Sequence, residues 1–171
     1  MQFRQLARRA FSSTPLTKAV ALALCSACAL ACGGQDTLVP ETPEMLNLLQ
    51  EASSAWAEAG LTPPSVSDHG THNVHVVDDI DAECGAALGA STLGCVHFDP
   101  LAIYISSSTP APLLARTVLH EMGHTIRGDG EHLSVADGCP EHSRGPFVMC
   151  SAPAVDAPTH PDVSFIGGSP K

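Results

Sequence analysis

The sequence predicts a small mixed α+β domain, and three observations lead to this fold class. Apolar residues recur at helical spacing in two long segments, residues 43–59 and about 110–127. Between them lie two short stretches with the composition and alternation of strands, residues 73–77 and 101–106. A short apolar segment near residue 160 follows the second helix. The order helix, strands, helix, short helix implies a domain with a reduced sheet.

The first 31 residues have the features of a secretory signal peptide. They contain no acid, and a thirteen-residue apolar run from Ala19 to Ala31 is too short to span a bilayer. The run ends in Ala29-Leu30-Ala31-Cys32, which resembles a bacterial lipoprotein processing site with Cys32 as the acylated residue; Cys25 and Cys28 are competing positions. We therefore expect an exported cell-envelope lipoprotein, or a secreted protein if Cys32 is not acylated, with residues 32–40 as a tether. The basic residues of this segment are Arg4, Arg8, Arg9 and Lys18.

The cysteines after Cys32 form an even set of four, which predicts two disulfides in an exported domain. Three connectivities are open, and the two pairs nearest in sequence would each close a short loop. A zinc cluster of cysteines is the weaker alternative, because no C-x-x-C spacing occurs after the signal segment. The four residues are Cys84, Cys95, Cys139 and Cys150.

The composition after Cys32 favours one acidic domain, residues 41–171, that we expect to be a monomer. Residues 33–171 hold eighteen acidic and four basic residues, a formal charge of −14, which argues against binding to nucleic acid. Aromatic residues are scarce, so we expect disulfides and a metal ion to contribute to stability.

The first helix is expected to begin at Thr42-Pro43-Glu44, a cap followed by proline, and to end at Gly60. In the strand at 101–106, Ile103 and Ile105 fall on one face. The C-terminal helix is expected to start with the capping pattern from Thr159 to Asp162 and to carry Val163, Phe165 and Ile166. The apolar positions of the first helix are Met45, Leu48, Leu49, Ala52, Trp56 and Ala59.

The second long helix is expected to begin at Thr109-Pro110 and to end at Gly128. At about 100° per residue, its apolar residues fall on one side, and His120 and His124 fall nearly opposite. One face of this helix should therefore be buried, and the other should face a cleft. The apolar residues are Ala115, Val118, Leu119, Met122 and Ile126.

This helix carries the pattern HExxH in His120, Glu121 and His124. Residues i and i+4 share one face of a helix, so the two imidazoles can hold one metal ion while Glu121 reaches an attacking water. The pattern also arises by chance on an ordinary amphipathic helix whose histidines are solvated, so the residues that follow must decide between the two interpretations.

The chain continues through Gly128 and His132 to Met149, and here the sequence resembles the metzincins, in particular the matrixin-like metalloproteases. That resemblance implies a zincin domain with one zinc ion on His120, His124 and His132, and with Met149 in a tight turn beneath the metal. The glycine comes one residue later, and the histidine two residues later, than in the pattern HExxHxxGxxH. Asp129, Glu131 and His142 are therefore alternative third ligands.

The resemblance implies a zinc metalloendopeptidase that cleaves protein or peptide substrates, in which Glu121 takes a proton from the attacking water and passes it to the leaving amine. The alternative is an exported zinc-binding lipoprotein with little or no turnover. Two further groups could bind a second zinc or calcium, although solvated loops explain them as well. They are Asp68, His69, His72 and His75, and then Asp78, Asp79, Asp81 and Glu83.

Overall fold

The computed structural model describes residues 37–85, 92–140 and 145–167, which belong to one compact unit. The signal segment, Cys32 and His142 lie outside the described residues. The fold class is α+β, as predicted. The elements in order are β1 (Thr37–Leu38), α2 (Pro43–Glu58), β2 (Ser65–Val66), β3 (Val74–Val77), α3 (Ile80–Cys84), β4 (Gly94–Phe98), β5 (Leu101–Ser106), α4 (Ala111–Arg127), the 3-10 turn η2 (Val135–Asp137) and α5 (His160–Gly167).

A three-stranded sheet has the order β3-β5-β4, with β3 parallel and β4 antiparallel to the central strand β5. β5 has the bounds expected from the sequence, and Ile103 and Ile105 are buried on one face. β3 begins one residue later than expected, at Val74. The edge strand β4 was not predicted, because only two of its five residues are large apolar ones and they do not alternate with polar residues over a long enough run.

The folded unit begins earlier than predicted. Residues 37–40 were assigned to a tether, yet β1 pairs with β2 in a small parallel sheet and Leu38 is fully buried. The Asn73 side chain accepts a hydrogen bond from Val39 N at 2.7 Å, which fixes this segment beside β3. A two-residue strand carries too little periodicity to be recognised in a sequence.

Helix α2 begins as predicted, because Thr42 is its N-cap and the side chain accepts a hydrogen bond from Met45 N at 3.2 Å. Its buried face packs against α4, and the indole nitrogen of Trp56 donates to the carbonyl of Leu119 at 2.9 Å. Met45, Leu49, Ala52 and Trp56 are buried, whereas Leu48 is only partly buried.

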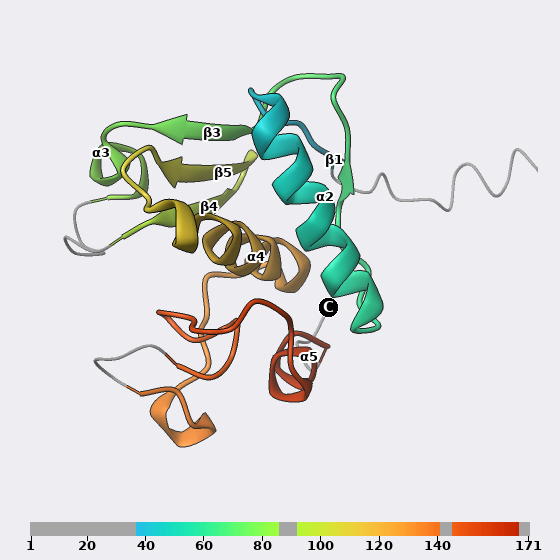
Figure 1. Cartoon of the computed structure of the whole chain (residues 1–171), viewed down its shortest axis with the longest axis vertical. Helices are drawn as coiled ribbons and strands as arrows, with labels where there is room; N and C mark the ends of the chain where they lie inside the picture. The colour runs from blue at the N-terminus through green and yellow to red at the C-terminus, as the bar shows by residue number, and fades with distance from the viewer. Residues whose placement is uncertain (1–36, 86–91, 141–144, 168–171) are drawn as a thin grey trace, which may run out of the picture. The chain divides into compact units, whose positions relative to one another are not determined.

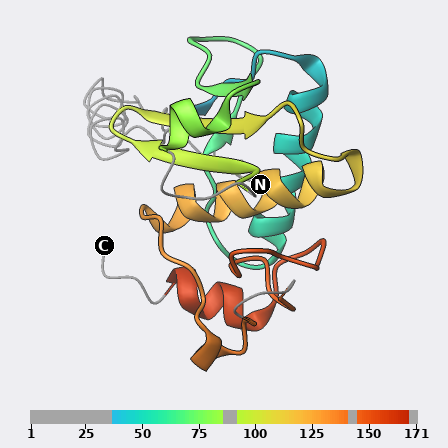
Figure 2. The same cartoon turned by 90° about the vertical axis from the view of Figure 1, so that its left-hand side faces the viewer.

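Helix α4 lies between the sheet and the C-terminal segment, with α2 along its side (Figures 1 and 2). Its start and the burial of Ala115 differ from the prediction. Its N-cap is Pro110 without a side-chain hydrogen bond, and Thr109 contacts the carbonyl of Leu93 instead. The helix is buried all round from Thr117 to His124, while Ala115 is exposed. The reason is that the C-terminal segment covers the histidine face. Gly128 ends the helix in the left-handed conformation, as predicted.

After α4 the chain runs beneath the helix with little regular structure (Figure 2). The two disulfides are Cys84–Cys95 and Cys139–Cys150, which is the connectivity of nearest neighbours among the three left open. The first joins α3 to β4, and the second closes the loop that holds Val148 and Met149. In the part of the chain that the structure describes, no helix is long and apolar enough to cross a membrane.

Candidate metal centre

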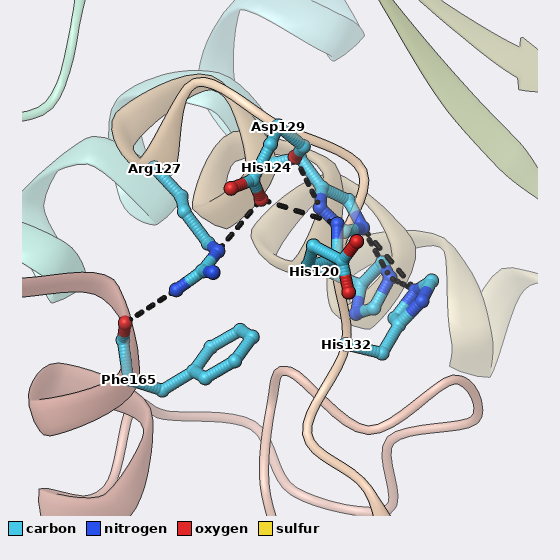
Figure 3. Close-up of polar contacts among 7 residues, drawn as sticks. His120, His124, Arg127, Asp129, His132 and Phe165 are labelled. Carbon is cyan, nitrogen blue, oxygen red and sulfur yellow. Dashed lines mark hydrogen bonds and ion pairs between the residues drawn. The ribbon is translucent and has the colours of Figure 1, made fainter. Parts of the chain in front are cut away.

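Three histidine side chains meet beneath α4 (Figure 3). His120 Nε2 lies 3.1 Å from His124 Nε2 and 3.1 Å from His132 Nε2, and the third side of this triangle is 3.3 Å. His120 and His124 come from one face of α4, and His132 returns from the loop that follows Gly128. The sequence predicted the first two positions from helical spacing, and the structure brings His132 to them.

The Nδ1 atoms of the two helical histidines are held by backbone carbonyls. His120 Nδ1 lies 2.7 Å from the carbonyl oxygen of Val148, and His124 Nδ1 lies 3.0 Å from that of Asp129. A carbonyl oxygen only accepts, so each Nδ1 carries the hydrogen and donates it. Each Nε2 therefore presents a lone pair towards the other histidines, which is the arrangement of metal-ligating imidazoles with oriented tautomers.

Burial keeps these imidazoles neutral. Loss of solvent, followed by the neighbouring His124, lowers the pKa of His120 to about 3, and loss of solvent together with His132 lowers the pKa of His124 to about 4. Loss of solvent around the ring also lowers the pKa of His132, although the residue as a whole is exposed. Neutral imidazole is the form that binds a cation.

The donor set fits a tetrahedral metal ion. With metal–nitrogen distances of about 2.0–2.1 Å, neighbouring ligand atoms of a tetrahedron lie about 3.3–3.4 Å apart, close to the triangle seen here. Lone pairs this close repel one another unless a cation lies between them. The described residues supply three imidazoles and no fourth ligand, so one position of a tetrahedral ion is left open, which distinguishes this geometry from a closed structural site. The group could therefore hold a metal ion.

Asp129, one of the alternative third ligands, is engaged elsewhere. The Asp129 carboxylate accepts hydrogen bonds from Arg127 Nε at 2.6 Å and from Glu131 N at 3.1 Å. Among the described residues, no other set of three His, Cys, Asp or Glu gathers as a metal site. His75 instead pairs with Glu41, and His69 with Asp68. In the acidic segment 78–83, Asp79 caps α3 and Asp78 accepts from Ser107.

Met149 lies directly beneath the metal-binding face of α4. It is fully buried, and its sulfur occupies the space where a Cβ on Gly123 would stand, together with the ring of Trp56. A side chain at Gly123, between the two helical histidines, would therefore collide with this packing. The structure thus places Met149 against α4 at Gly123, and its role as the turn residue beneath a metal stays a prediction of the resemblance.

The backbone of Met149 is held by a buried carboxylate, and the sequence did not indicate this contact. Asp162 is fully buried, and its Oδ1 accepts a hydrogen bond from Met149 N at 2.7 Å. Its Oδ2 accepts from Thr159 N and from Thr159 Oγ1, at 2.8 and 2.7 Å. The sequence indicated only the capping role of Asp162 at the start of α5, because a contact with a residue thirteen positions away leaves no local pattern.

Glu121 is buried against β4 and lacks a polar partner. Its exposed fraction is 4%, and among the described residues no hydrogen bond or ion pair reaches its carboxylate. Burial raises its pKa to about 8. Gly94 makes this position possible, because a Cβ there would stand only 2.8 Å from Glu121 Oε1. Sequence reasoning missed Gly94, which lies in the strand that was not predicted.

Comparisons of the chain with models of known protein families, with curated proteins and with solved structures found no match. The assignment of a function therefore depends on the chemistry of this site.

Proposed function

We propose that this protein is an exported zinc-dependent metalloendopeptidase, in which His120, His124 and His132 hold the metal and Glu121 is the general base. The observation that carries the proposal is the triangle of Nε2 atoms, 3.1–3.3 Å apart, on the helix that also carries Glu121, a buried carboxylate for which the described residues provide no hydrogen bond or ion pair. When bound, zinc supplies Lewis acidity, which polarises a peptide carbonyl and lowers the pKa of water towards about 7.

The chain's own residues would then move the proton. In this proposal Glu121, the residue after His120 on α4, takes the proton of the attacking water and delivers it to the leaving amine. A cation held by the neighbouring histidines favours the charged form of Glu121 and opposes the effect of burial on its pKa. A bound metal ion would therefore help to keep Glu121 ionised, which is the form that acts as a base.

Glu121 is buried, and the described residues give its carboxylate no hydrogen bond, which favours an enzyme over a zinc-binding module without turnover. Buried polar groups are normally hydrogen-bonded, and a carboxylate left without a partner costs stability. A module that only binds zinc through three histidines gains nothing from this residue. A base that must exchange protons with a substrate has a reason to keep its oxygens unengaged.

Export is the second part of the proposal. Two disulfides are typical of proteins that fold in an oxidising compartment. This agrees with a signal peptide and with a lipid on Cys32 as the membrane attachment. Mass spectrometry of the mature N-terminus from the native host tests it, because an unmodified terminus at another residue would contradict the lipoprotein assignment.

The test of the enzyme compares zinc content and peptide cleavage in the wild type and in Glu121→Gln. Glu121 is not a ligand, so the variant should keep about one zinc per chain yet lose about 10²–10⁴-fold in activity against a peptide library. His124→Ala should lose both zinc and activity. Glu58→Gln, at an exposed position on α2, is the matched control and should keep both.

Two results would overturn the enzyme assignment. One is a zinc-loaded wild type whose library shows no cleavage that a chelator abolishes, which would leave the binding module as the function. The other is a Glu121→Gln variant that cleaves as fast as the wild type.

A further inference from the structure

The connection between the second and third histidines is longer than in the pattern it resembles. His124 and His132 are eight residues apart, against six in HExxHxxGxxH. Two extra residues add conformational freedom to the loop that must return His132 to the helix, and that freedom has an entropic cost. Some interaction must therefore restrict this loop.

Arg127, the last residue of α4, makes the contacts that restrict it (Figure 3). Its Nε donates to Asp129 Oδ1 at 2.6 Å, and a terminal nitrogen donates to the carbonyl of Phe165 in α5 at 2.6 Å. The guanidinium also lies 3.9 Å above the centre of the Phe165 ring. The Arg127 side chain is 14% exposed and that of Asp129 is 39% exposed, so solvent reaches the carboxylate more than the guanidinium.

Asp129 connects this arginine to a metal ligand. Its carboxylate binds Arg127 and also accepts the hydrogen bond of Glu131 N at 3.1 Å, while its backbone carbonyl accepts from His124 Nδ1 at 3.0 Å. Rotation of the Asp129 peptide would remove the acceptor that fixes the tautomer and the ring orientation of His124. Glu131, whose backbone is held by the same carboxylate, directly precedes His132.

We propose that Arg127 is a positioning residue of the metal centre, which acts through Asp129 to orient His124 and to hold the loop that presents His132. This inference rests on the metal-binding part of the proposed function and is independent of peptide hydrolysis. Arginine suits the role because its planar fork reaches the Asp129 carboxylate and the Phe165 carbonyl together, which a single ammonium group does not. The same side chain fastens α5 to the end of the helix that carries the ligands.

A second arginine on the same helix provides a matched control. Arg116 forms a two-pronged ion pair with Asp156, which also joins α4 to the segment after it. Neither residue contacts a histidine of the metal centre. The two pairs have the same chemistry, and only the pair of Arg127 and Asp129 touches a ligand.

The experiment measures the zinc dissociation constant by competition with a chromophoric chelator. Removal of groups that orient metal ligands typically weakens metal affinity about 10–100-fold. We expect a loss in this range for Arg127→Met and for Asp129→Ala, and less than about a twofold change for Arg116→Met. The double variant of Arg127 and Asp129 should lose little more than either single one, because both belong to one unit.

Two further measurements separate positioning from general stability. Asp129→Asn keeps the side-chain oxygen that accepts from Arg127 and from Glu131 N, so it should retain most of the zinc affinity that Asp129→Ala loses. In the cobalt-substituted protein, Arg127→Met and Asp129→Ala should change the visible absorption of the metal, and Arg116→Met should leave it as in the wild type. Asp129→Ala decides the question if Arg127→Met does not fold, because it leaves the contacts between Arg127 and α5 in place.

A wild type that binds no zinc would contradict the proposed function itself. A wild type that binds zinc while folded Arg127→Met and Asp129→Ala bind it within about twofold would contradict only the positioning role. Equal losses in Arg127→Met and Arg116→Met would likewise show that the effect is one of general stability.

Discussion

The two parts of the molecule on either side of Gly128 are held together in different ways. The N-terminal region, residues 37–127, contains both sheets and the two long helices, and its core is formed by side chains spaced regularly along these elements. In the C-terminal region, residues 128–167, one turn η2 and the eight-residue helix α5 are the helical elements. Its buried side chains join the same core from irregular segments, and a disulfide, a buried carboxylate and the arginine at the end of α4 hold it in addition.

The metal centre combines both kinds of support. His120, Glu121 and His124 keep their positions as long as α4 is helical, because their spacing alone places them on the site. His132, Val148 and Met149 belong to the C-terminal region and reach the site only through contacts between distant residues. Damage to the N-terminal region outside α4 should therefore reduce stability alone, and damage to the C-terminal region should reduce stability and metal affinity together.

The largest expected contrast is between the two disulfides, which have the same sequence separation of 11 residues. Each should contribute about 3 kcal/mol to the free energy of unfolding, because the constraint on the unfolded chain is the same. Replacement of both cysteines of Cys139–Cys150 by serine should also weaken zinc affinity at least about tenfold, since Val148 orients His120 from this loop. Replacement of Cys84 and Cys95 should leave zinc affinity nearly unchanged.

Urea denaturation and zinc competition on the two double variants measure both quantities. An equal loss of zinc affinity in both would mean that the regions do not differ in their support of the site. The comparison in the metal-free state serves as a check, because there both variants should lose a similar amount of stability.

The same division explains what the sequence could predict. Regular periodicity predicted α2, β5 and α4 with nearly their observed bounds, and one helical turn predicted the relation of His120 to His124. The edge strand β4 and the small sheet of β1 and β2 escaped because they are short and lack a clear alternation. Periodicity alone gives no position for Met149, which the structure buries against Gly123 of α4.

The rest of the site depends on pairs of residues far apart in the sequence. Gly94 leaves the space that the Glu121 side chain occupies, and Asp162 accepts a hydrogen bond from the backbone of Met149. No local sequence pattern indicates either contact. The face of α4 that carries the histidines was expected to face a cleft, and the sequence does not show that the C-terminal region packs against it. Long-range packing decided these features, and it becomes visible only in three dimensions.

A second prediction concerns the pH dependence of stability in the metal-free protein, where the groups that titrate lie between the two regions. Burial lowers the pKa of His120 to about 3 and of His124 to about 4 from 6.5, so the unfolded chain binds more protons as the pH falls below 6.5. This contribution to stability is present above 6.5 and is lost at lower pH. Burial raises the pKa of Glu121 from 4.5 to about 8, so the stability linked to its proton is lost as the pH rises through that range.

The two effects oppose each other between pH 4.5 and 6.5, where two histidines outweigh one glutamate. Chelator-treated protein should therefore be most stable at about pH 6.5–7, and Glu121→Gln should remove the decline between there and pH 8. Urea denaturation at a series of pH values measures this. The same alkaline decline in the wild type and in Glu121→Gln would show that Glu121 is not buried as a neutral acid.

The smallest expected effect comes from the start of α2, which lies in the N-terminal region and contacts no residue of the metal centre through its cap. Thr42→Ala removes the acceptor of Met45 N and should lower the free energy of unfolding by about 1 kcal/mol. Zinc affinity should stay within about twofold, because α4 keeps its own hydrogen bonds and Trp56 still donates to Leu119. Denaturation and chelator competition on the same preparation give both values. A substantial loss of zinc affinity in this variant would show that α2 transmits its stability to the metal ligands, and the two regions would then act as one cooperative unit.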